Sequence, residues 1–370
     1  MLLYIQRLFR VSVINFKFFS MLAFSPVSLP LSIILLCIIP SFCQQHHAKK
    51  HYLKNFKIVH TFYAIYFREF DDPCFDNFRT FVQRAVYQSS AIKYNFILIG
   101  NTVIPRDILA RVQNLTNVYI HHVPNHGADL CAFSRVLRRY HERDKSLFQD
   151  DKHFFFLNCG ARGPYVNIIH DERNALSPLF WLSPYLDYLK HDVQIVGPTI
   201  SCEIHPHVQS YAALMKAEAA ETAMELWDCG FNRSKLEIIR ASEVGLSQKL
   251  IADGGNIASV ALFHGLDFRL QENRYCGLGK DIGRYFNPFL CHNATEVDSV
   301  VNIPQFSYKC LHLDPCDTVF IKYGGEAFKD KLLSEQTLAR IRQLDQRWNE
   351  YFSMSLGMRS RTGNYQICAK

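Results

Sequence analysis

The chain has 370 residues, of which 48% are hydrophobic and 20% are charged. This composition is typical of a globular protein with a buried core, and the length fits one large domain or two modest ones. The 41 basic and 34 acidic residues give a formal net charge of only +7. Basic residues are scattered except between Arg135 and Lys145, and no nucleic-acid-binding motif accompanies them, so nucleic acid is not an expected partner.

An uncharged segment near the N-terminus, residues 21–42, is long enough to cross a membrane, which takes about 20 apolar residues. Basic residues both precede and follow it, so the distribution of positive charge leaves its orientation open. The alternative is a signal peptide that is cleaved beside the small residues Ser41 and Cys43. We expect residues 1–45 to be a cytosolic tail with a signal anchor, or a cleaved leader, and residues 46–56 to be a linker.

Two features favour a body that faces the lumen of the Golgi or the ER, or a secreted body if the leader is cleaved. Glycosylation sequons begin at Asn114, Asn232 and Asn293. Of 12 cysteines, Cys37 and Cys43 lie in or beside the leader, which leaves an even number suited to disulfides. No Cys-x-x-Cys or Cys/His metal spacing is present, so a zinc site is not expected.

Apolar runs alternate with segments of helical periodicity through the rest of the chain. The expected strands are residues 58–67, 94–100, 118–123, 154–157, 193–196 and 236–239. The expected helices are residues 74–88, 105–112, 130–143, 179–189, 211–227, 243–252 and 329–352. This alternation predicts an α/β fold with a mostly parallel sheet and helices on both faces.

Several boundaries carry expectations of their own. We expect Ser242 to cap the helix that follows it, and Gly254 with Gly255 to end that helix. Residues 57–270 would form the α/β domain, and residues 271–370 a cysteine-containing, irregular cap with one long helix. The tail after Met354 is expected to be mobile.

The apolar strand at residues 154–157 is followed by Asn158-Cys159-Gly160-Ala161-Arg162. In open α/β sheets, ligands bind beside the carboxyl ends of the strands, so this turn is the first place to look for chemistry. The alternative is an ordinary core strand that ends in a tight turn.

Three blocks of sequence carry a resemblance to a known family. They are Val-Pro-Asn-His-Gly-Ala-Asp at residues 123–129, Phe-Leu-Asn-Cys-Gly-Ala-Arg-Gly-Pro at 156–164, and Val-Gly-Pro-Thr-Ile-Ser-Cys-Glu at 196–203, which continues to residue 210 and to Glu-Val-Gly-Leu-Ser at 243–247. In this order they resemble glycosyltransferases of the GT-A type, more closely the bacterial rhamnan synthesis F proteins and their eukaryotic relatives. The resemblance covers residues 57–262. It implies a GT-A-like, Rossmann-like fold, a nucleotide-sugar donor, and a glycan or glycoconjugate acceptor.

The resemblance also implies roles for particular residues. The nucleotide-sugar-binding set would be Asn125, Gly127, Asp129, Asn158, Cys159, Gly160 and Arg162. The acceptor-side set would be Thr199, Glu203, His207 and Gln209. Glu243 would be the base that activates the acceptor hydroxyl, as an inverting transfer requires.

The family's Asp-x-Asp motif is missing, since Asn158-Cys159-Gly160 stands in its place. Mn²⁺ or Mg²⁺, the possible cofactors, prefer oxygen ligands, and the loss of both carboxylates weakens such a site severely, so no metal ligand is assigned. Arg162 or a nearby histidine would then stabilise the leaving phosphate.

Each candidate also has a plain structural interpretation. Asn125 and Gly127 fit a simple turn, and Asp129 fits a helix cap. Glu243 fits a first-turn acid stabilised by the helix dipole. The remaining alternatives are a surface arginine for Arg162, a hydrogen-bonded structural histidine for His207, and core packing rather than sugar stacking for Trp181 and Tyr185.

The sequence therefore predicts a glycosyltransferase, and the resemblance of the Glu243 block implies transfer with inversion. The main alternative is a catalytically inactive relative that binds glycan or nucleotide, which the missing Asp-x-Asp favours. A disulfide-rich adhesion domain would explain the sequons and cysteines but not the ordered blocks.

Overall fold

The computed structural model describes residues 58–67, 72–127, 129–149, 151–168, 177, 179–189, 192–201, 205–227, 234–261, 266–270, 314–323, 335–357 and 366–368. The chain divides into the units Met1–Phe56 and Lys57–Lys370, and every described residue belongs to the second. The expected membrane segment and linker, Glu203, and the sequons at Asn232 and Asn293 lie outside the described residues. Within the described part of the chain, no helix is both long and apolar enough to cross a membrane.

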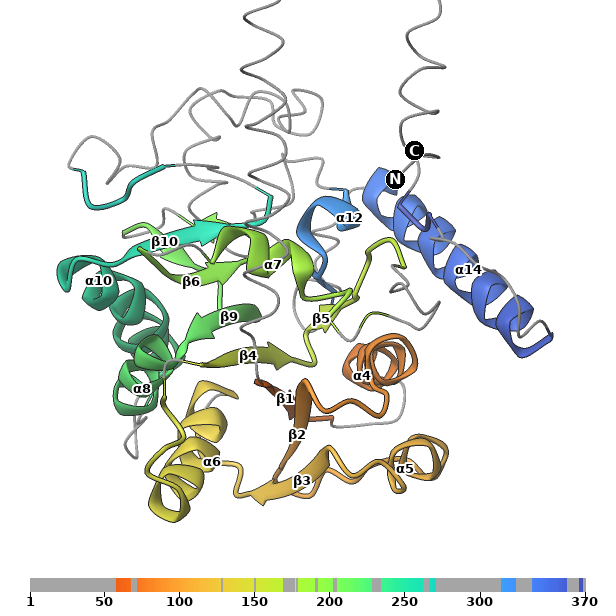
Figure 1. Ribbon diagram of the computed structural model, residues 1–370, viewed down its shortest axis with the longest axis horizontal. Coiled ribbons are helices and arrows are strands. Elements are labelled where there is room, and N and C mark those ends of the chain that lie inside the picture. Colours follow the sequence, from red (N-terminus) through yellow and green to blue (C-terminus); the bar gives the residue numbers. More distant parts are fainter. Residues whose placement is uncertain are drawn as a thin grey trace, which may run out of the picture. The chain divides into compact units, whose positions relative to one another are not determined.

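A seven-stranded sheet forms the centre of the described fold, in the strand order β10-β6-β9-β4-β1-β2-β3 (Figure 1). Its strands are β1 (Ile58–Ile65), β2 (Ile92–Ile99), β3 (Val118–Val123), β4 (Lys152–Asn158), β6 (Val193–Gly197), β9 (Ala212–Lys216) and β10 (Asn256–Ser259). β1 runs parallel to β2 and β4, β2 to β3, and β6 to β10, whereas β9 is antiparallel to β4 and β6. All strands except β9 therefore point the same way, which confirms the mostly parallel sheet.

Helices and two short strand pairs complete the described part of the chain. The helices are α4 (Pro73–Ala85), α5 (Arg106–Val112), α6 (Asp129–Arg143), α7 (Ser183–Tyr188), α8 (Ala217–Leu226), α9 (Lys235–Ile238), the π-helix η1 (Ile239–Val244), α10 (Gly245–Ala252), α12 (Pro315–Thr318) and α14 (Glu335–Gly357). β5 (Ala161–Arg162) pairs with β11 (Ile321–Lys322), and β7 (Ile200–Ser201) pairs with β8 (His207–Val208), both antiparallel.

The core is built from aromatic side chains on both faces of the sheet, because consecutive residues of a strand point to opposite faces. The ring of Phe156 in β4 lies 5.2 Å from that of Phe133 in α6. The ring of Phe155 lies 5.1 Å from each of Trp181 and Tyr185, near α7. Figure 1 shows α6 and α8 on one side of the sheet and α4 on the other. Helices on both faces are thus confirmed, and Trp181 and Tyr185 are fully buried core residues.

The expected helix at residues 211–227 is wrong in its first half, where Ala212–Lys216 forms β9. This segment lies between β4 and β6, and its first four side chains are buried. Ala, Leu, Met and Lys favour helix, but pairing with two buried strands outweighs that modest preference. A short apolar run of this kind cannot be assigned from periodicity alone.

The expected strand at residues 236–239 is also wrong, because α9 and η1 occupy it. Ser242 is not a helix cap, since it lies inside η1 and its hydroxyl donates to the carbonyl of Leu226 (3.2 Å). The expected helix end is confirmed: α10 stops at Ala252, and Gly254 adopts a φ of +89° that glycine accommodates without strain.

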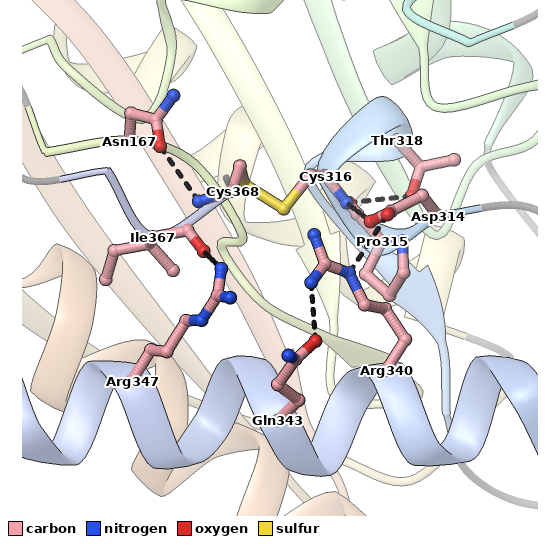
Figure 2. The surroundings of a disulfide bond; sticks show 10 residues. All are labelled: Asn167, Asp314, Pro315, Cys316, Thr318, Arg340, Gln343, Arg347, Ile367 and Cys368. Atoms are coloured by element: carbon pink, nitrogen blue, oxygen red, sulfur yellow. Dashed lines mark hydrogen bonds and ion pairs between the residues drawn. A yellow bond between two sulfur atoms is a disulfide. The ribbon is translucent and has the colours of Figure 1, made fainter. Parts of the chain in front are cut away.

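A disulfide joins Cys316, in α12, to Cys368 near the C-terminus (Figure 2). The amide of Cys368 donates to Asn167 Oδ1 (2.8 Å), and Arg347 of α14 donates to the carbonyl of Ile367 (2.9 Å). The side chain of Ile367 is fully buried. The expectation of a mobile tail is therefore wrong for these residues, which pack against α14 because of a disulfide partner far away in sequence.

Candidate functional site

Asn158 ends β4 at the carboxyl edge of the sheet, with β1 on one side and β9 on the other. Its amide donates to the carbonyl of Tyr211, just before β9 (3.1 Å). Its side-chain Nδ2 donates to a carboxylate oxygen of Asp129, and its Oδ1 accepts from the amide of Gly160 (3.0 Å). Both ends of the Asn158 side chain are therefore held in one orientation.

Asp129 is the first residue of α6 and lies beside Asn158 because the turn after β3 leads directly into that helix. One carboxylate oxygen accepts from the amide of Leu130 (3.1 Å), and the other accepts from Asn158. Burial raises the pKa of Asp129, the hydrogen bond from Asn158 opposes the shift, and the negative charge of Glu243 adds to it. Asp129 thus serves both the helix start and the Asn158 contact.

Glu243 is carried by η1 and is partly exposed. Its Oε1 accepts from the amide of Ser210 (2.7 Å), the residue before Tyr211. The backbone amide of Asn158 donates to the carbonyl of the next residue, Tyr211. The Glu243 carboxylate and the Asn158 backbone are therefore bonded to consecutive residues just before β9. Single turns of π-helix occur often at functional sites. The structure therefore brings Asn158, Asp129 and Glu243 together at one place on the sheet edge.

The first-turn interpretation of Glu243 does not hold, because η1 runs into α10 without a break. Further along the same helical segment, Ser247 Oγ accepts from the amide of Val208 (3.1 Å), and Gln248 donates to the carbonyl of Pro206 (2.8 Å). Together with the Ser210 contact of Glu243, these bonds fasten the segment that leads into β9. Sequence reasoning missed Ser210, whose backbone amide, not its side chain, makes the contact.

The described residues of the expected acceptor side are buried. Thr199, His207 and Gln209 are only 3%, 1% and 3% exposed. The hydroxyl of Thr199 donates to Gln209 Oε1, and His207 Nδ1 donates to the carbonyl of His205 (2.8 Å). The bond between Thr199 and Gln209 ties the residue before β7 to the residue after β8, and in this conformation the three buried side chains offer no surface to an acceptor.

Cys159 and Gly160 form a turn whose polar groups are already paired. Cys159 is joined to Cys74 by a disulfide, its amide donates to the carbonyl of Ala64 (3.1 Å), and its carbonyl accepts from Asn77 (3.0 Å). The amide of Gly160 is bonded to Asn158, and its carbonyl accepts from the amide of Tyr323 (2.7 Å). The expectation that this turn binds the donor with these groups therefore requires the turn to rearrange.

Arg162 is buried behind the same turn, so the surface-arginine interpretation is wrong. Its guanidinium pairs with Asp76 (2.8 Å) and with Asp345 of α14 (2.7 Å), and it lies over the ring of Tyr323 at 5.2 Å. Because two carboxylates already pair with Arg162, its guanidinium is not available to bind phosphate in this conformation. Asp345 lies 183 residues away from Arg162 in the chain, so no local sequence pattern could identify it as the partner.

Asn125 and Gly127 are exposed in the turn between β3 and α6. Gly127 has a φ of +87°, which explains why glycine occupies this position. Asn125 packs on the turn after β2: a Cβ added to Gly100 would lie 3.1 Å from the Asn125 Cβ. Both residues thus sit at the carboxyl edge of the sheet, where the plain-turn and nucleotide-contact interpretations remain compatible with their geometry.

No group of three or more His, Cys, Asp or Glu side chains that could hold a metal ion is found among the described residues. We therefore assign no ligand for Mn²⁺ or Mg²⁺ within that part of the chain. The reaction proposed below contains no step through a metal.

No family model matches this chain, and no curated protein matches it. Solved structures of several glycosyltransferases show a distant likeness, among them the following three. Mouse xyloside xylosyltransferase 1 in its apo form is 11% identical, covers 52% of this chain and 82% of its own, and has a TM-score of 0.28. The glycosyltransferase GlyE of Streptococcus pneumoniae TIGR4 is 12% identical, with coverage of 85% and 66% and a TM-score of 0.35. Core-mannan synthase A of Aspergillus fumigatus, in a Mn/GDP form, is 9% identical, with coverage of 54% and 72% and a TM-score of 0.21.

Proposed function

We propose that this protein is a glycosyltransferase that moves a sugar from a nucleotide-sugar donor to a glycan or glycoconjugate acceptor, with inversion. The observation that carries the proposal is the meeting of Asn158, Asp129 and Glu243 between the ends of β4 and β3 and the start of β9. Ligands of open α/β sheets bind at this edge. The ordered blocks of sequence that resemble GT-A enzymes supply the reaction class.

In this proposal, Glu243 accepts the proton of the acceptor hydroxyl. The oxygen of that hydroxyl attacks the anomeric carbon of the donor sugar, and the nucleoside diphosphate leaves from the opposite face. The hydrogen bond from the amide of Ser210 to Oε1 fixes the direction of the carboxylate. Asp129 and Asn158 bind hydroxyl groups of the donor, for which their paired side chains provide acceptors and a fixed orientation.

The test begins with purified full-length protein and a panel of nucleotide sugars, each assayed for hydrolysis and transfer with and without Mn²⁺. Glu243→Gln preserves the shape and the Ser210 contact but removes the base, so turnover should fall roughly 10²–10⁴-fold while donor affinity is retained. Glu221→Gln, on the exposed face of α8, is the matched control and should leave turnover unchanged. Unchanged turnover in Glu243→Gln would reject Glu243 as the base.

One observation favours a second candidate, a relative that binds nucleotide or glycan without turnover. The turn that replaces Asp-x-Asp is closed by a disulfide, and Arg162 is matched by carboxylates. Neither the turn at Cys159 nor the side chain of Arg162 is then placed to stabilise a leaving diphosphate. Calorimetry that detects binding of a nucleotide sugar by a protein that neither hydrolyses nor transfers it would favour this candidate, whereas measurable transfer would exclude it.

A further inference from the structure

Among the described residues, β3 lies at one edge of the seven-stranded sheet and has β2 as its one partner strand. Tyr119 and Ile120 in its first half are 39% and 42% exposed, although both are large and apolar. An edge strand presents unpaired backbone groups, and an exposed apolar one is a template for pairing with another chain. This part of the surface therefore needs some means of protection.

The second half of β3 has such protection from α6. Arg139 donates to the carbonyl of His122 (3.2 Å), and Arg135 donates to the carbonyl of Pro124 just after the strand (3.2 Å). Charged side chains over an edge are a common way to prevent edge-to-edge pairing. Within the described residues, no arginine makes a comparable contact at Tyr119 or Ile120.

A glycosylation sequon, Asn114-Leu115-Thr116, lies immediately before this exposed half. Asn114 is exposed in the turn between α5 and β3. The turn is well fixed: Thr116 and Gln88 exchange two hydrogen bonds (2.7 and 3.0 Å), and the buried Asn117 donates to the carbonyls of Tyr87 and Ile92 (3.1 and 2.9 Å). Asn114 is therefore exposed in a well-fixed turn, just before the start of β3.

The disulfides indicate the compartment in which the chain folds. Cys74 is joined to Cys159 and Cys316 to Cys368, and Cys131 is disulfide-bonded as well. Structural disulfides form in oxidising compartments such as the ER lumen, which is also where asparagine-linked glycans are added. The sequon and the disulfides are independent observations that point to the same place.

We infer that Asn114 carries an N-linked oligosaccharide that covers the exposed start of β3. An oligosaccharyltransferase would join Asn114 Nδ2 to the anomeric carbon of a lipid diphosphate-linked oligosaccharide. The new C–N bond replaces the C–O bond to the diphosphate, Nδ2 loses one proton, and the lipid diphosphate leaves. Asn114 lies before the start of β3, at the amino ends of the parallel strands, whereas Asn158 lies at the carboxyl end of β4. The glycan thus leaves the candidate site open, and the inference does not depend on the proposed function.

The modification is tested on the full chain expressed in a eukaryotic secretory host. Peptide mapping after treatment with a peptide N-glycosidase should find Asn114 converted to aspartate, and it resolves this site from Asn232 and Asn293. Asn114→Gln and Thr116→Val should each lose one glycan. Thr116→Ser keeps both the sequon and a hydroxyl for Gln88, so it should keep the glycan. An unmodified Asn114 in the wild-type protein would overturn the inference.

The protective role is tested by light scattering on the folded wild type before and after enzymatic removal of the glycan, and on Asn114→Gln. Loss of the glycan should at least double the apparent mass at concentrations where the glycosylated protein is unchanged. Adding Ile120→Lys to Asn114→Gln should reverse the association, because a charge on an edge strand opposes pairing. Equal masses with and without the glycan would overturn the protective role.

Discussion

The side-chain amide of Asn158 donates a hydrogen bond to the carboxylate of Asp129, which lies 29 residues earlier in the chain. This bond joins the end of β4 to the start of α6, two elements that also pack together through the rings of Phe156 and Phe133. The other end of the Asn158 side chain accepts from Gly160, so the amide cannot turn away without breaking two bonds. The candidate site therefore depends on an orientation that neither residue could maintain alone.

Asp129 should make folding stability depend on pH. Burial raises its folded-state pKa above the ordinary 3.8, so the folded protein holds this proton more tightly than the unfolded chain does. The stabilisation is complete below the unfolded-state pKa and is lost as the pH rises through the folded-state pKa. Denaturant titrations at a series of pH values should show a steeper fall in the free energy of unfolding for the wild type than for Asp129→Asn. Parallel curves for the two proteins would refute this assignment, and the exposed Glu221→Gln should follow the wild type.

Asp345 should be among the most sensitive positions for stability, because its carboxylate lies between two buried arginines. It pairs with Arg84 (2.6 Å) and Arg162 (2.7 Å), whose side chains are 5% and 10% exposed. Burial by itself would raise the pKa of Asp345, but the charges of the two arginines outweigh it and hold the pKa below the ordinary value. Asp345→Asn removes the carboxylate that Arg84 and Arg162 share and leaves Arg162 with the exposed Asp76 alone. It should lower the free energy of unfolding by about 3–5 kcal/mol.

The matched control for Asp345 is Asp76→Asn, which removes the other carboxylate partner of Arg162. The side chain of Asp76 is 58% exposed, and surface ion pairs contribute little, so the loss should stay below about 1 kcal/mol. Chemical denaturation followed by tryptophan fluorescence would measure both losses. Equal losses in the two variants would show that burial of the pair is not what matters.

The disulfide between Cys74 and Cys159 should order the site as well as stabilise the fold, because Cys159 directly follows Asn158. It closes a loop with a sequence separation of 85, and the disulfide between Cys316 and Cys368 closes one of 52. Replacing either pair by serines should cost about 2–5 kcal/mol. Only the first replacement should speed hydrogen exchange at the amide of Gly160, which is bonded to Asn158. Equal exchange in both variants would contradict this link, and mass spectrometry of the peptide containing residue 160 provides the measurement.

Much of the sheet could be predicted from the sequence, because a buried strand consists of a short local run of apolar residues. The strands at residues 58–65, 92–99, 118–123 and 193–197 coincide with such runs to within a few residues. The β9 segment could not be assigned this way, since its helix-favouring residues are held extended by β4 and β6. The π-helix was missed for a similar reason: its sequence looks like a short strand followed by a helix cap.

The sequence by itself determined the α/β class, the order of the main strands and helices up to β6, and the residues around Asn158 at which to look for chemistry, because these depend on local periodicity and on strand ends. Only the tertiary structure decided which of those residues meet. It brought Glu243 to Ser210, paired Cys159 with Cys74, and placed Arg162 against Asp345. Contacts of this kind join parts of the chain that lie far apart in sequence, and they exist only once the sheet and the C-terminal helix have packed together.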